Sequence, residues 1–324
     1  MSALKNIQQP VAAEIKAFEG KFKEHLSSRV ALVDKIMRFI VKRKGKQMRP
    51  LLVFLTAKML GKIEDRTYIG ASLVEMMHTA TLVHDDVVDD SFQRRGFFSV
   101  NALWKNKVAV LIGDYMLSRV LLLAVENKTY DLLEAVSKAV KAMSEGELLQ
   151  IEKARKLDIT EEVYFEVIEQ KTASLIQSCC AVGALSAGAD QATVEKAAEM
   201  GRQLGLAFQI KDDLFDFERA ANTGKPQGID IQEQKMTLPL IAALNAATEA
   251  ERKRIIVKIK RENKNPKAVA EVLAFVDNHG GVAYAREKML AHLKAARDIL
   301  NSFPDNEPRA ALDQLFTFTV NRNK

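Results

Sequence analysis

The sequence predicts an all-α protein built from long helices, and three observations favour this class. No proline lies between Pro50 and Pro226, and the intervening residues are rich in Ala, Leu, Glu and Lys, which are good helix formers. Apolar residues recur at helical spacing, as in Leu73, Met76 and Ala80, whereas sustained alternation with period two is missing. The chain also has no GxGxxG or Walker-type phosphate loop, so a nucleotide-binding α/β fold fits poorly.

Residues that favour turns divide the chain into helix-length segments. Breaks are expected near residues 45–50, 61–65, 96–101, 127, 188, 222–228 and 280. They are spaced like the turns between packed helices, and none is a long linker of Gly, Ser or Pro. We therefore expect one helical domain that spans residues 1–324.

Composition and cysteine usage are those of an ordinary globular protein. Of the 324 residues, 48% are hydrophobic and 28% are charged, and the mean hydropathy is -0.10. The longest apolar stretches are too short to cross a bilayer, as in residues 117–125, where Ser118 and Arg119 intervene. The start of the chain has no signal-peptide pattern, and the adjacent Cys179 and Cys180 cannot form a disulfide framework. We therefore expect a cytoplasmic protein that is not integral to a membrane.

The chain is basic, with 48 Lys and Arg against 42 Asp and Glu, a net charge of +6 and a pI near 9.1. A helical protein that binds nucleic acid is one class with such a charge. That class predicts a basic stripe with interleaved aromatic residues, whereas this chain has one Trp and five Tyr, and its densest basic run, residues 42–46, is short. A smaller anionic ligand fits the sequence better.

Two acidic clusters stand out against this basic background, and both have the pattern DDxxD. The outer aspartates, Asp85 with Asp89 and Asp212 with Asp216, are four residues apart, so on a helix they share one face about 6 Å apart along the axis. Like charges at this spacing destabilise a helix, so the arrangement favours an external cation. Sites made only of carboxylate oxygens suit Mg²⁺, whose coordination is usually completed by water and substrate phosphates.

An acidic run can also be a solvated helix face, but both clusters lie among apolar neighbours such as Leu82, Leu214 and Phe215. Basic residues adjoin both clusters. They are Lys46 and Arg49 before the first cluster, Arg94 and Arg95 after it, and Lys225 and Lys235 after the second. Carboxylates for a metal beside Arg and Lys for phosphate describe a diphosphate-binding site.

Seven segments carry a resemblance to a known family. In chain order they are KGKQMRP (44–50), LVHDDVVDDSFQRRG (82–96), GDY (113–115), EGELLQ (145–150), KTASL (171–175), FQIKDDLFDF (208–217) and GKPQGIDIQEQKMTLPL (224–240). They resemble motifs of the trans-isoprenyl diphosphate (polyprenyl) synthases, and most closely those of long-chain members such as octaprenyl diphosphate synthases. Two positions depart from the family's pattern: Lys44 replaces the first Gly of GGKxxRP, and Gln234 stands where EGK is common before Lys235.

The resemblance implies the isoprenoid synthase fold, an antiparallel helix bundle around a central cavity, and a homodimer. It also implies a Mg²⁺-dependent prenyltransferase that condenses isopentenyl diphosphate with an allylic diphosphate to give a longer all-trans polyprenyl diphosphate. Such a reaction would proceed by ionisation, condensation and elimination, with the departing diphosphate removing the proton. No side chain is therefore nominated as the base.

The resemblance also implies roles for individual residues. Mg²⁺ would be held by Asp85, Asp89 and Asp212, with Asp86, Asp213 and Asp216 in supporting or water-mediated roles. The allylic diphosphate would be contacted by Arg94, Lys171, Lys235 and Lys225, and isopentenyl diphosphate by Lys46, Arg49, His78 and Arg95. The allylic cation would be stabilised by oxygens of Thr172 and Gln209. Without the resemblance, His78 is better interpreted as a buried core histidine.

Product length is expected to depend on the helix that leads down from the first cluster. Ala80 and Thr81, five and four residues before Asp85, correspond to bulky aromatic residues in short-chain members of the family, whereas here both are small. Met77 is flexible and lies about one turn further down, and one helical turn rises about 5.4 Å, comparable to one isoprene unit. We therefore expect products longer than geranylgeranyl diphosphate, a tunnel floor deeper in the bundle along residues 111–120, and transient membrane contact during product release.

Three other classes of protein share single features with this sequence. A class I terpene cyclase also uses DDxxD, but its second metal motif resembles NSE/DTE, whereas this chain repeats DDxxD. A noncatalytic regulatory subunit of a heteromeric prenyl synthase would be indicated by degraded aspartates, yet both clusters are complete. A helical protein that binds nucleic acid would show steeply salt-dependent DNA binding without prenyl transfer.

Overall fold

A computed structural model of the chain describes residues 2–43, 45, 47–94, 96–154, 159–217 and 227–321. The residues group into two compact units. The first unit comprises Met1–Val140, Gln177–Ala198 and Asn301–Gln314, and the second comprises Lys141–Ile176, Glu199–Leu300 and Leu315–Lys324. The expectation of a single domain stays a prediction.

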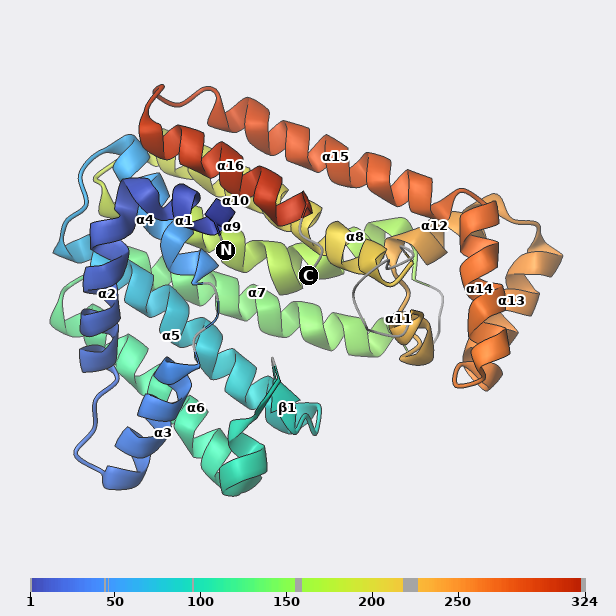
Figure 1. Ribbon diagram of the computed structural model, residues 1–324, viewed down its shortest axis with the longest axis horizontal. Helices are drawn as coiled ribbons and strands as arrows, with labels where there is room; N and C mark the ends of the chain where they lie inside the picture. The colour runs from blue at the N-terminus through green and yellow to red at the C-terminus, as the bar shows by residue number, and fades with distance from the viewer. Residues whose placement is uncertain are drawn as a thin grey trace. The chain divides into compact units, whose positions relative to one another are not determined.

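Helices make up most of the regular structure (Figure 1). In chain order the elements are α1 (Ser2–Gln8), η1 (Gln9–Val11), α2 (Ala12–His25), α3 (Ala31–Lys42), α4 (Met48–Leu60), α5 (Asp65–Val88), β1 (Gln93–Arg94), β2 (Phe97–Phe98), α6 (Val100–Glu126), α7 (Tyr130–Ala154), α8 (Glu161–Ile168), η2 (Glu169–Ala173), α9 (Ser174–Ser186), α10 (Gln191–Phe215), α11 (Ile229–Gln232), α12 (Leu238–Ala246), α13 (Glu249–Glu262), α14 (Pro266–Asn278), α15 (Gly281–Leu300) and α16 (Glu307–Asn321). The strands β1 and β2 form a two-residue antiparallel pair, the only sheet within the described ranges. The predicted all-α class is confirmed.

The breaks expected from turn residues coincide with helix ends wherever the structure describes them. Helix α4 ends at Leu60 and α5 begins at Asp65, while α6 ends at Glu126 and α9 at Ser186. Glycines with φ near +75° follow α9 and α14, at Gly188 and Gly280, where a side chain would strain the left-handed backbone. The break at residues 222–228 falls largely outside the described residues.

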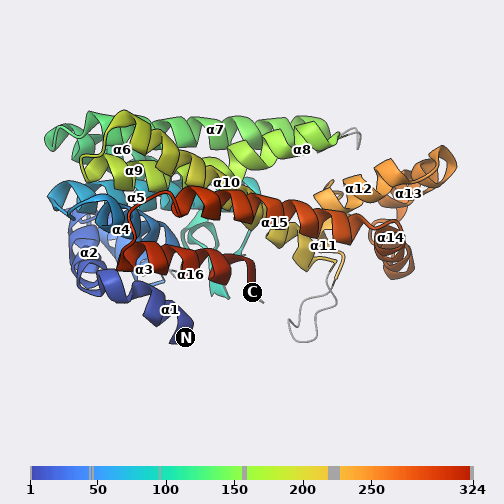
Figure 2. The same ribbon diagram turned by 90° about the horizontal axis from the view of Figure 1, so that it is seen from above.

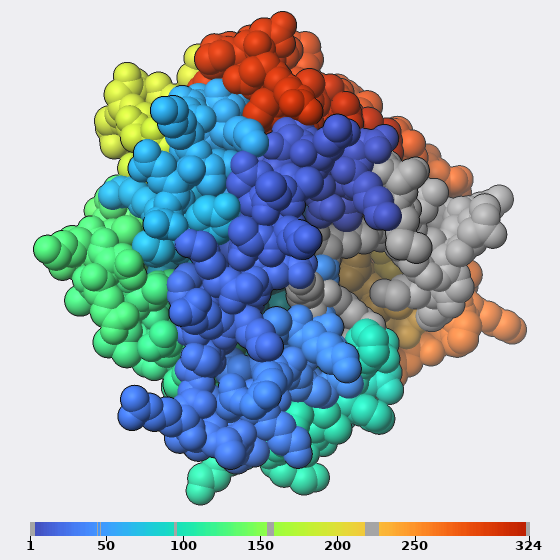
Figure 3. All heavy atoms as spheres, turned by 60° about the vertical axis from the view of Figure 1, so that its left-hand side comes forward, coloured from blue at the N-terminus to red at the C-terminus, as the bar shows by residue number. Residues whose placement is uncertain are grey.

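The core of the first unit is built around α5, which packs against both α4 and α6. Figure 1 shows α5 and α6 running side by side. Helix α4 is apolar on almost every face, which is the pattern of a fully buried helix, and residues from Pro50 to Ala57 are all buried. Figure 3 shows the N-terminal helices (dark blue) on the surface. Helices α2 and η1 pack against α4.

Helix α6 is long and apolar enough to cross a membrane by length and composition alone, and no other helix in the described part of the chain is. Core helices of globular proteins can be equally long and apolar. Of its most apolar stretch of 18 residues, 39% is buried inside the protein, and the helix carries Asp114 and Arg119. Its backbone is interrupted at Lys105, where φ is 72°. The expectation that the protein is not integral to a membrane stays a prediction.

In the second unit, α8 runs through a π-helical turn, η2, into α9. Two glycines lie against this turn. A Cβ on Gly146 of α7 would come 2.8 Å from the Cβ of Gln170, and a Cβ on Gly205 of α10 would come 2.5 Å from the Cα of Ala173. Both helices can therefore pack closely on η2 only because these positions lack side chains. Further along the chain, α12 packs against α15, and α13 and α14 form a pair (Figure 2).

The two cysteines of the chain, both in α9, are fully buried, as expected of core residues. Burial raises the pKa of the Cys180 thiol to about 12 and raises that of Cys179 as well. Neither thiol is therefore ionised at neutral pH.

Candidate active site

The first acidic cluster lies at the C-terminal end of α5. Asp85 and Asp86 belong to the last helical turn, and the backbone N–H of Asp89, which caps the helix, donates to the carbonyl of Asp85 over 2.8 Å. The side chains of Asp85 and Asp89 are exposed, whereas Asp86 is buried. No basic residue lies in the last turn of α5, and the carboxylates lie at the negative end of the helix dipole. An external cation would be stabilised there.

The end of α5 is held against α6 by the contact between His84 and Gly113. The Nε2 atom of His84 lies 3.2 Å from the carbonyl oxygen of Val110 and 3.5 Å from a carboxylate oxygen of Asp114. A Cβ on Gly113 would come 2.1 Å from the same nitrogen, so a larger residue would push the helices apart. This contact gives the GDY segment a structural role next to the first cluster.

A cavity of about 130 Å³ opens beside this cluster within the first unit. Its wall combines charged and polar side chains with aromatic rings. Among the lining residues are Arg49, Glu75, His78, Asp86, Phe39, Phe97 and Phe98. The structure thus brings together Arg49 and His78, two of the four residues expected to bind isopentenyl diphosphate. The other two, Lys46 and Arg95, lie outside the described residues, as does the side chain of Arg94.

The residues expected to control product length lie inside the first unit. Ala80 is fully buried and Met77 is 6% exposed, whereas Thr81 is half-buried and its hydroxyl donates to the carbonyl of His78. None of the three lines the 130 Å³ cavity, which borders their neighbours Thr79 and Leu82 instead. Their place along a product tunnel stays a prediction.

Residues 111–120 of α6, where we expect the tunnel floor, have one buried face and one exposed face. Ile112, Met116 and Val120 are buried in the first unit, whereas Leu111 is 58% exposed. The buried three recur at helical spacing, so only this face of α6 is available to a tunnel within the unit.

The second acidic cluster lies at the C-terminal end of α10 and repeats the pattern of the first. Asp212 and Asp216 are half-buried, the middle residue Asp213 is buried, and no basic residue lies in the last turn of the helix. Burial raises the pKa of Asp213 to about 7, although two hydrogen-bond donors act in the opposite direction. In both clusters the middle aspartate therefore points into the protein and the first aspartate is the more accessible.

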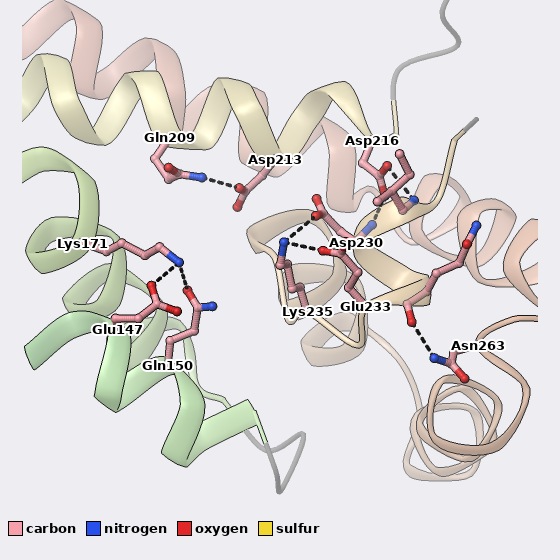
Figure 4. Close-up of polar contacts among 12 residues, drawn as sticks. Glu147, Gln150, Lys171, Gln209, Asp213, Asp216, Asp230, Glu233, Lys235 and Asn263 are labelled. Carbon is pink, nitrogen blue, oxygen red and sulfur yellow. Dashed lines mark hydrogen bonds and ion pairs between the residues drawn. The ribbon is translucent and has the colours of Figure 1, made fainter. Parts of the chain in front are cut away.

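Each oxygen of the Asp213 carboxylate accepts a hydrogen bond. The hydroxyl of Tyr164 donates to one over 2.7 Å, and the amide of Gln209 donates to the other over 3.0 Å. The other end of the Gln209 side chain, its Oε1 atom, accepts from the hydroxyl of Thr172 over 2.8 Å. Figure 4 shows Gln209 and Asp213 together on α10.

Asp216 has a different role from the other aspartates of its cluster. Its two carboxylate oxygens accept from the backbone N–H groups of Ile229 and Asp230 over 2.9 and 3.0 Å. These groups belong to the first turn of α11, so Asp216 caps the short helix that follows the second cluster (Figure 4).

Two predicted phosphate-binding lysines of the second unit are paired with acidic residues (Figure 4). Lys171, on the π turn, pairs with Glu147 and lies 3.2 Å from the amide oxygen of Gln150. Lys235 pairs with Glu233 at 2.5 Å and with Asp230 at 3.7 Å. Lys225 lies outside the described residues.

Four residues at this site are not among those predicted from the sequence: Glu147, Gln150, Tyr164 and Asp230. A signal was present for the first two, because positions three apart in EGELLQ share a helix face. Tyr164 stands seven residues before Lys171, which is two helical turns, but nothing in the sequence pairs it with a residue 49 positions away. Asp230 is recognised as part of the site only from its ion pair with Lys235 in the structure.

The predicted metal ligands Asp85, Asp89 and Asp212 belong to both units, so each unit supplies only part of the set. No group of three His, Cys, Asp or Glu side chains among the described residues is arranged to hold a metal ion by itself. The donor chemistry nevertheless fits Mg²⁺, because the accessible groups are carboxylates at helix ends that lack basic residues.

Residues 30–276 match the model of the polyprenyl synthetase family, which is more than half of the chain. The chain belongs to this family. It is 35% identical over 319 residues to the all-trans-nonaprenyl-diphosphate synthase (geranyl-diphosphate specific) of Rhodobacter capsulatus, with 98% of this chain and 97% of the relative covered.

Two solved structures of this polyprenyl synthetase family show the same fold. A decaprenyl diphosphate synthase from Rhodobacter capsulatus matches with a TM-score of 0.92 at 34% identity, with 99% of each chain covered. A geranylgeranyl pyrophosphate synthase from Bacteroides thetaiotaomicron matches with a TM-score of 0.83 at 36% identity, with 99% of this chain and 100% of that chain covered. The predicted isoprenoid synthase fold and the predicted prenyltransferase class are confirmed, and the cyclase and regulatory-subunit alternatives are not favoured.

Proposed function

We propose that this polyprenyl synthetase extends an allylic diphosphate with isopentenyl diphosphate in a Mg²⁺-dependent reaction and releases an all-trans product longer than geranylgeranyl diphosphate. The observation that carries the proposal is the matched pair of carboxylate clusters at the ends of α5 and α10, each at the negative end of a helix that has no basic residue in its last turn. Two relatives named above make nonaprenyl and decaprenyl diphosphates.

In this proposal, Asp85, Asp89 and Asp212 would hold Mg²⁺ through their carboxylates. When bound, Mg²⁺ would neutralise the charge that develops on the leaving diphosphate and so assist cleavage of the C–O bond. Asp86, Asp213 and Asp216 support these residues without ligating the ion directly. Their burial, or their use as a helix cap, is consistent with that role.

Basic residues bind the two diphosphates. Lys171 and Lys235, joined by Arg94 and Lys225, would exchange their carboxylate partners for the allylic diphosphate. The present ion pairs keep both ammonium groups oriented until the substrate arrives. Isopentenyl diphosphate would bind at the cavity of the first unit. Its proposed ligands are Lys46, Arg49, His78 and Arg95.

Oxygen dipoles of Thr172 and Gln209 would stabilise the allylic cation without forming a bond to it. The double bond of isopentenyl diphosphate attacks this cation, and the departing diphosphate removes the proton. Water has to be excluded throughout, because it would trap the cation.

Product length is proposed to depend on small residues below the first cluster. Ala80 has no side chain beyond Cβ and Thr81 is small, so the growing tail can pass this level of α5. Each isoprene unit adds five carbons, and burial stabilises bound hydrocarbon by about 0.8 kcal/mol per CH₂, so long tails should leave slowly. We expect detergent or membrane to accelerate turnover for this reason.

Assembly as a homodimer is supported by the outer face of α6. Six large apolar residues of this helix are 40–58% exposed, namely Leu103, Val110, Leu111, Leu121, Leu122 and Val125. An apolar face of this extent is typical of a protein interface, and a twofold axis would let the same face cover itself. Light scattering should give twice the chain mass; a stable monomer at working concentration would contradict the dimer.

The proposal is tested by incubating the protein with isopentenyl diphosphate, a short allylic diphosphate and Mg²⁺, followed by mass analysis of the products. We expect all-trans chains longer than geranylgeranyl diphosphate, and no turnover after chelation of the metal until Mg²⁺ is restored. A cyclic hydrocarbon product, or a product no longer than geranylgeranyl diphosphate, would overturn the proposed reaction or the proposed length, respectively.

A further inference from the structure

Three hydrogen bonds connect the buried Tyr164 to Thr172 through the second acidic cluster. Tyr164 donates to Asp213 over 2.7 Å, Gln209 donates to the other oxygen of Asp213 over 3.0 Å, and Thr172 donates to Gln209 over 2.8 Å. Tyr164 lies on α8, Asp213 and Gln209 on α10, and Thr172 on the π turn. The chain thus joins three elements of the second unit.

The direction of each hydrogen bond follows from the donor and acceptor atoms that it joins. Gln209 donates to Asp213 through its Nε2 atom, so its Oε1 atom lies at the other side of the amide group. Its Oε1 atom then faces Thr172, and the hydroxyl proton of Thr172 has to point at that oxygen. Because a hydroxyl has only one proton, the lone pairs of Thr172 remain directed elsewhere, as the negative end of a dipole. Tyr164 and Gln209 thus hold the Asp213 carboxylate at both of its oxygens, which keeps the Gln209 amide in this orientation.

We propose that Tyr164 is a positioning residue for prenyl transfer: through Asp213 and Gln209 it fixes the hydroxyl of Thr172 with its lone pairs toward the allylic cation. This inference deepens the proposed function, since it rests on the cation-stabilising role given there to Thr172. It also assigns Asp213 to this chain of hydrogen bonds rather than to the metal. Both of its oxygens already accept a donor, and its side chain is 6% exposed.

The elements around the chain leave Thr172 little freedom to find another partner. Gly146 and Gly205 allow α7 and α10 to lie against opposite ends of the π turn, where their added Cβ atoms would overlap Gln170 and Ala173. The first residue of the turn, Glu169, pairs with Arg202 of α10 at 2.7 Å. The turn is therefore held by packing and by charge, and the orientation of the hydroxyl is the variable that Tyr164 controls.

The direct test is Tyr164→Phe, which removes one oxygen and leaves the ring. We expect kcat to fall about 10- to 100-fold, because one buried acceptor loses its donor and Gln209 can rotate. The KM values of both diphosphates and the Mg²⁺ concentration for half-maximal rate should stay within about twofold, because no substrate or metal contact is removed. A change in KM or in Mg²⁺ dependence without a fall in kcat would overturn the inference.

The matched control is Tyr284→Phe. Tyr284 also donates to a carboxylate, that of Glu161 at 2.8 Å, and lies in the same unit outside the chain of hydrogen bonds. Its kcat should stay within about twofold of wild type. Thermal unfolding of both variants sets an assay temperature at which each is folded. An equal loss of kcat in the two variants would show a general effect of removing a tyrosine hydroxyl and would overturn the specific role.

A double-mutant cycle separates positioning from general stabilisation. Thr172→Val should slow turnover, Thr172→Ser should restore most of it, and in the Thr172→Val background Tyr164→Phe should cost less than about twofold. Additive losses would overturn the inference. If Tyr164→Phe does not fold, Asp213→Asn, which changes the residue between Tyr164 and Gln209, takes its place in the cycle with the same expected non-additivity. A normal kcat in Thr172→Val would refute the proposed role of Thr172 in stabilising the cation. A lowered kcat in Thr172→Val together with a normal kcat in Tyr164→Phe would refute only the role of Tyr164.

Discussion

The ends of α5 and α10 carry the same five-residue pattern, yet their aspartates are used differently. In both clusters the middle aspartate is buried, at 4% exposure for Asp86 and 6% for Asp213. Asp86 borders a cavity lined by other charged side chains, whereas Asp213 is enclosed by Tyr164 and Gln209. The pattern DDxxD therefore determines which aspartates face outward on a helix, and the neighbouring elements determine what the others do.

The last aspartates differ as well. Asp89 is exposed and ends α5, and the backbone of Asp90 beyond it has a positive φ of 47°. Asp216 is half-buried and caps the next helix, α11. The first cluster is thus more open, and the second is more strongly connected to its surroundings. This difference suggests that the two clusters respond differently to equivalent substitutions.

The largest effect is expected where the clusters are alike, at their first aspartates. Asp85→Ala and Asp212→Ala should each lower kcat/KM by about a thousandfold or more, because each would remove a carboxylate proposed to hold Mg²⁺. Steady-state kinetics and circular dichroism should show lost turnover with unchanged helical content. Asp298→Ala, an exposed aspartate paired with Lys294, is the matched control. Near-normal turnover in either cluster variant would contradict the site assignment.

Product length should distinguish the segments of α5 and α10 that precede the two clusters. Ala80 and Ala207 each stand five residues before a first aspartate, and both are fully buried. A phenylalanine at either position overpacks the interior at a cost of about 1–3 kcal/mol. Only Ala80→Phe should shorten the product toward farnesyl or geranylgeranyl length, as measured by mass analysis. Unchanged products in Ala80→Phe, or equal shortening in Ala207→Phe, would mean that the tail does not follow α5.

The free energy of unfolding tests what the buried Asp213 contributes to the second cluster. Asp213→Ala leaves the buried hydroxyl of Tyr164 without its acceptor, which should cost about 1–3 kcal/mol relative to the variant that also has Phe at position 164. Chemical denaturation of this variant and of Tyr164→Phe/Asp213→Ala measures the effect. The double variant should recover part of the loss, because it no longer buries an unpaired hydroxyl. If the double variant is no more stable than Asp213→Ala, the hydrogen bond from Tyr164 is not the source of the stability that Asp213 provides.

The smallest effect is expected at the last aspartates. Asp216→Ala removes the cap of α11 and should cost about 1 kcal/mol, with faster hydrogen exchange at the amides of Ile229 and Asp230. Asp89→Ala, the equivalent change in the first cluster, should leave exchange at these two amides unchanged. Equal exchange rates in Asp216→Ala and wild type would contradict the capping role.

Helix positions and the acidic clusters could be predicted from the sequence because both depend on local periodicity and turn residues. The π turn could not, because residues 169–173 have an ordinary helical composition and the turn depends on close packing against Gly146 and Gly205. The bond between Tyr164 and Asp213 also could not be predicted, since it joins residues on different helices. The predicted phosphate-binding role of Lys171 gave no indication of its pairing with Glu147.

The burial of both thiols has a practical consequence. Cys179 and Cys180 are inaccessible and protonated at neutral pH, so maleimide or nitroxide reagents should leave the wild-type chain unlabelled. A cysteine introduced at an exposed position, such as Val88 at the end of α5, would then be the sole reactive group. A spectroscopic label at that position could follow the end of α5 as substrate binds, in a chain that needs no other cysteine replaced.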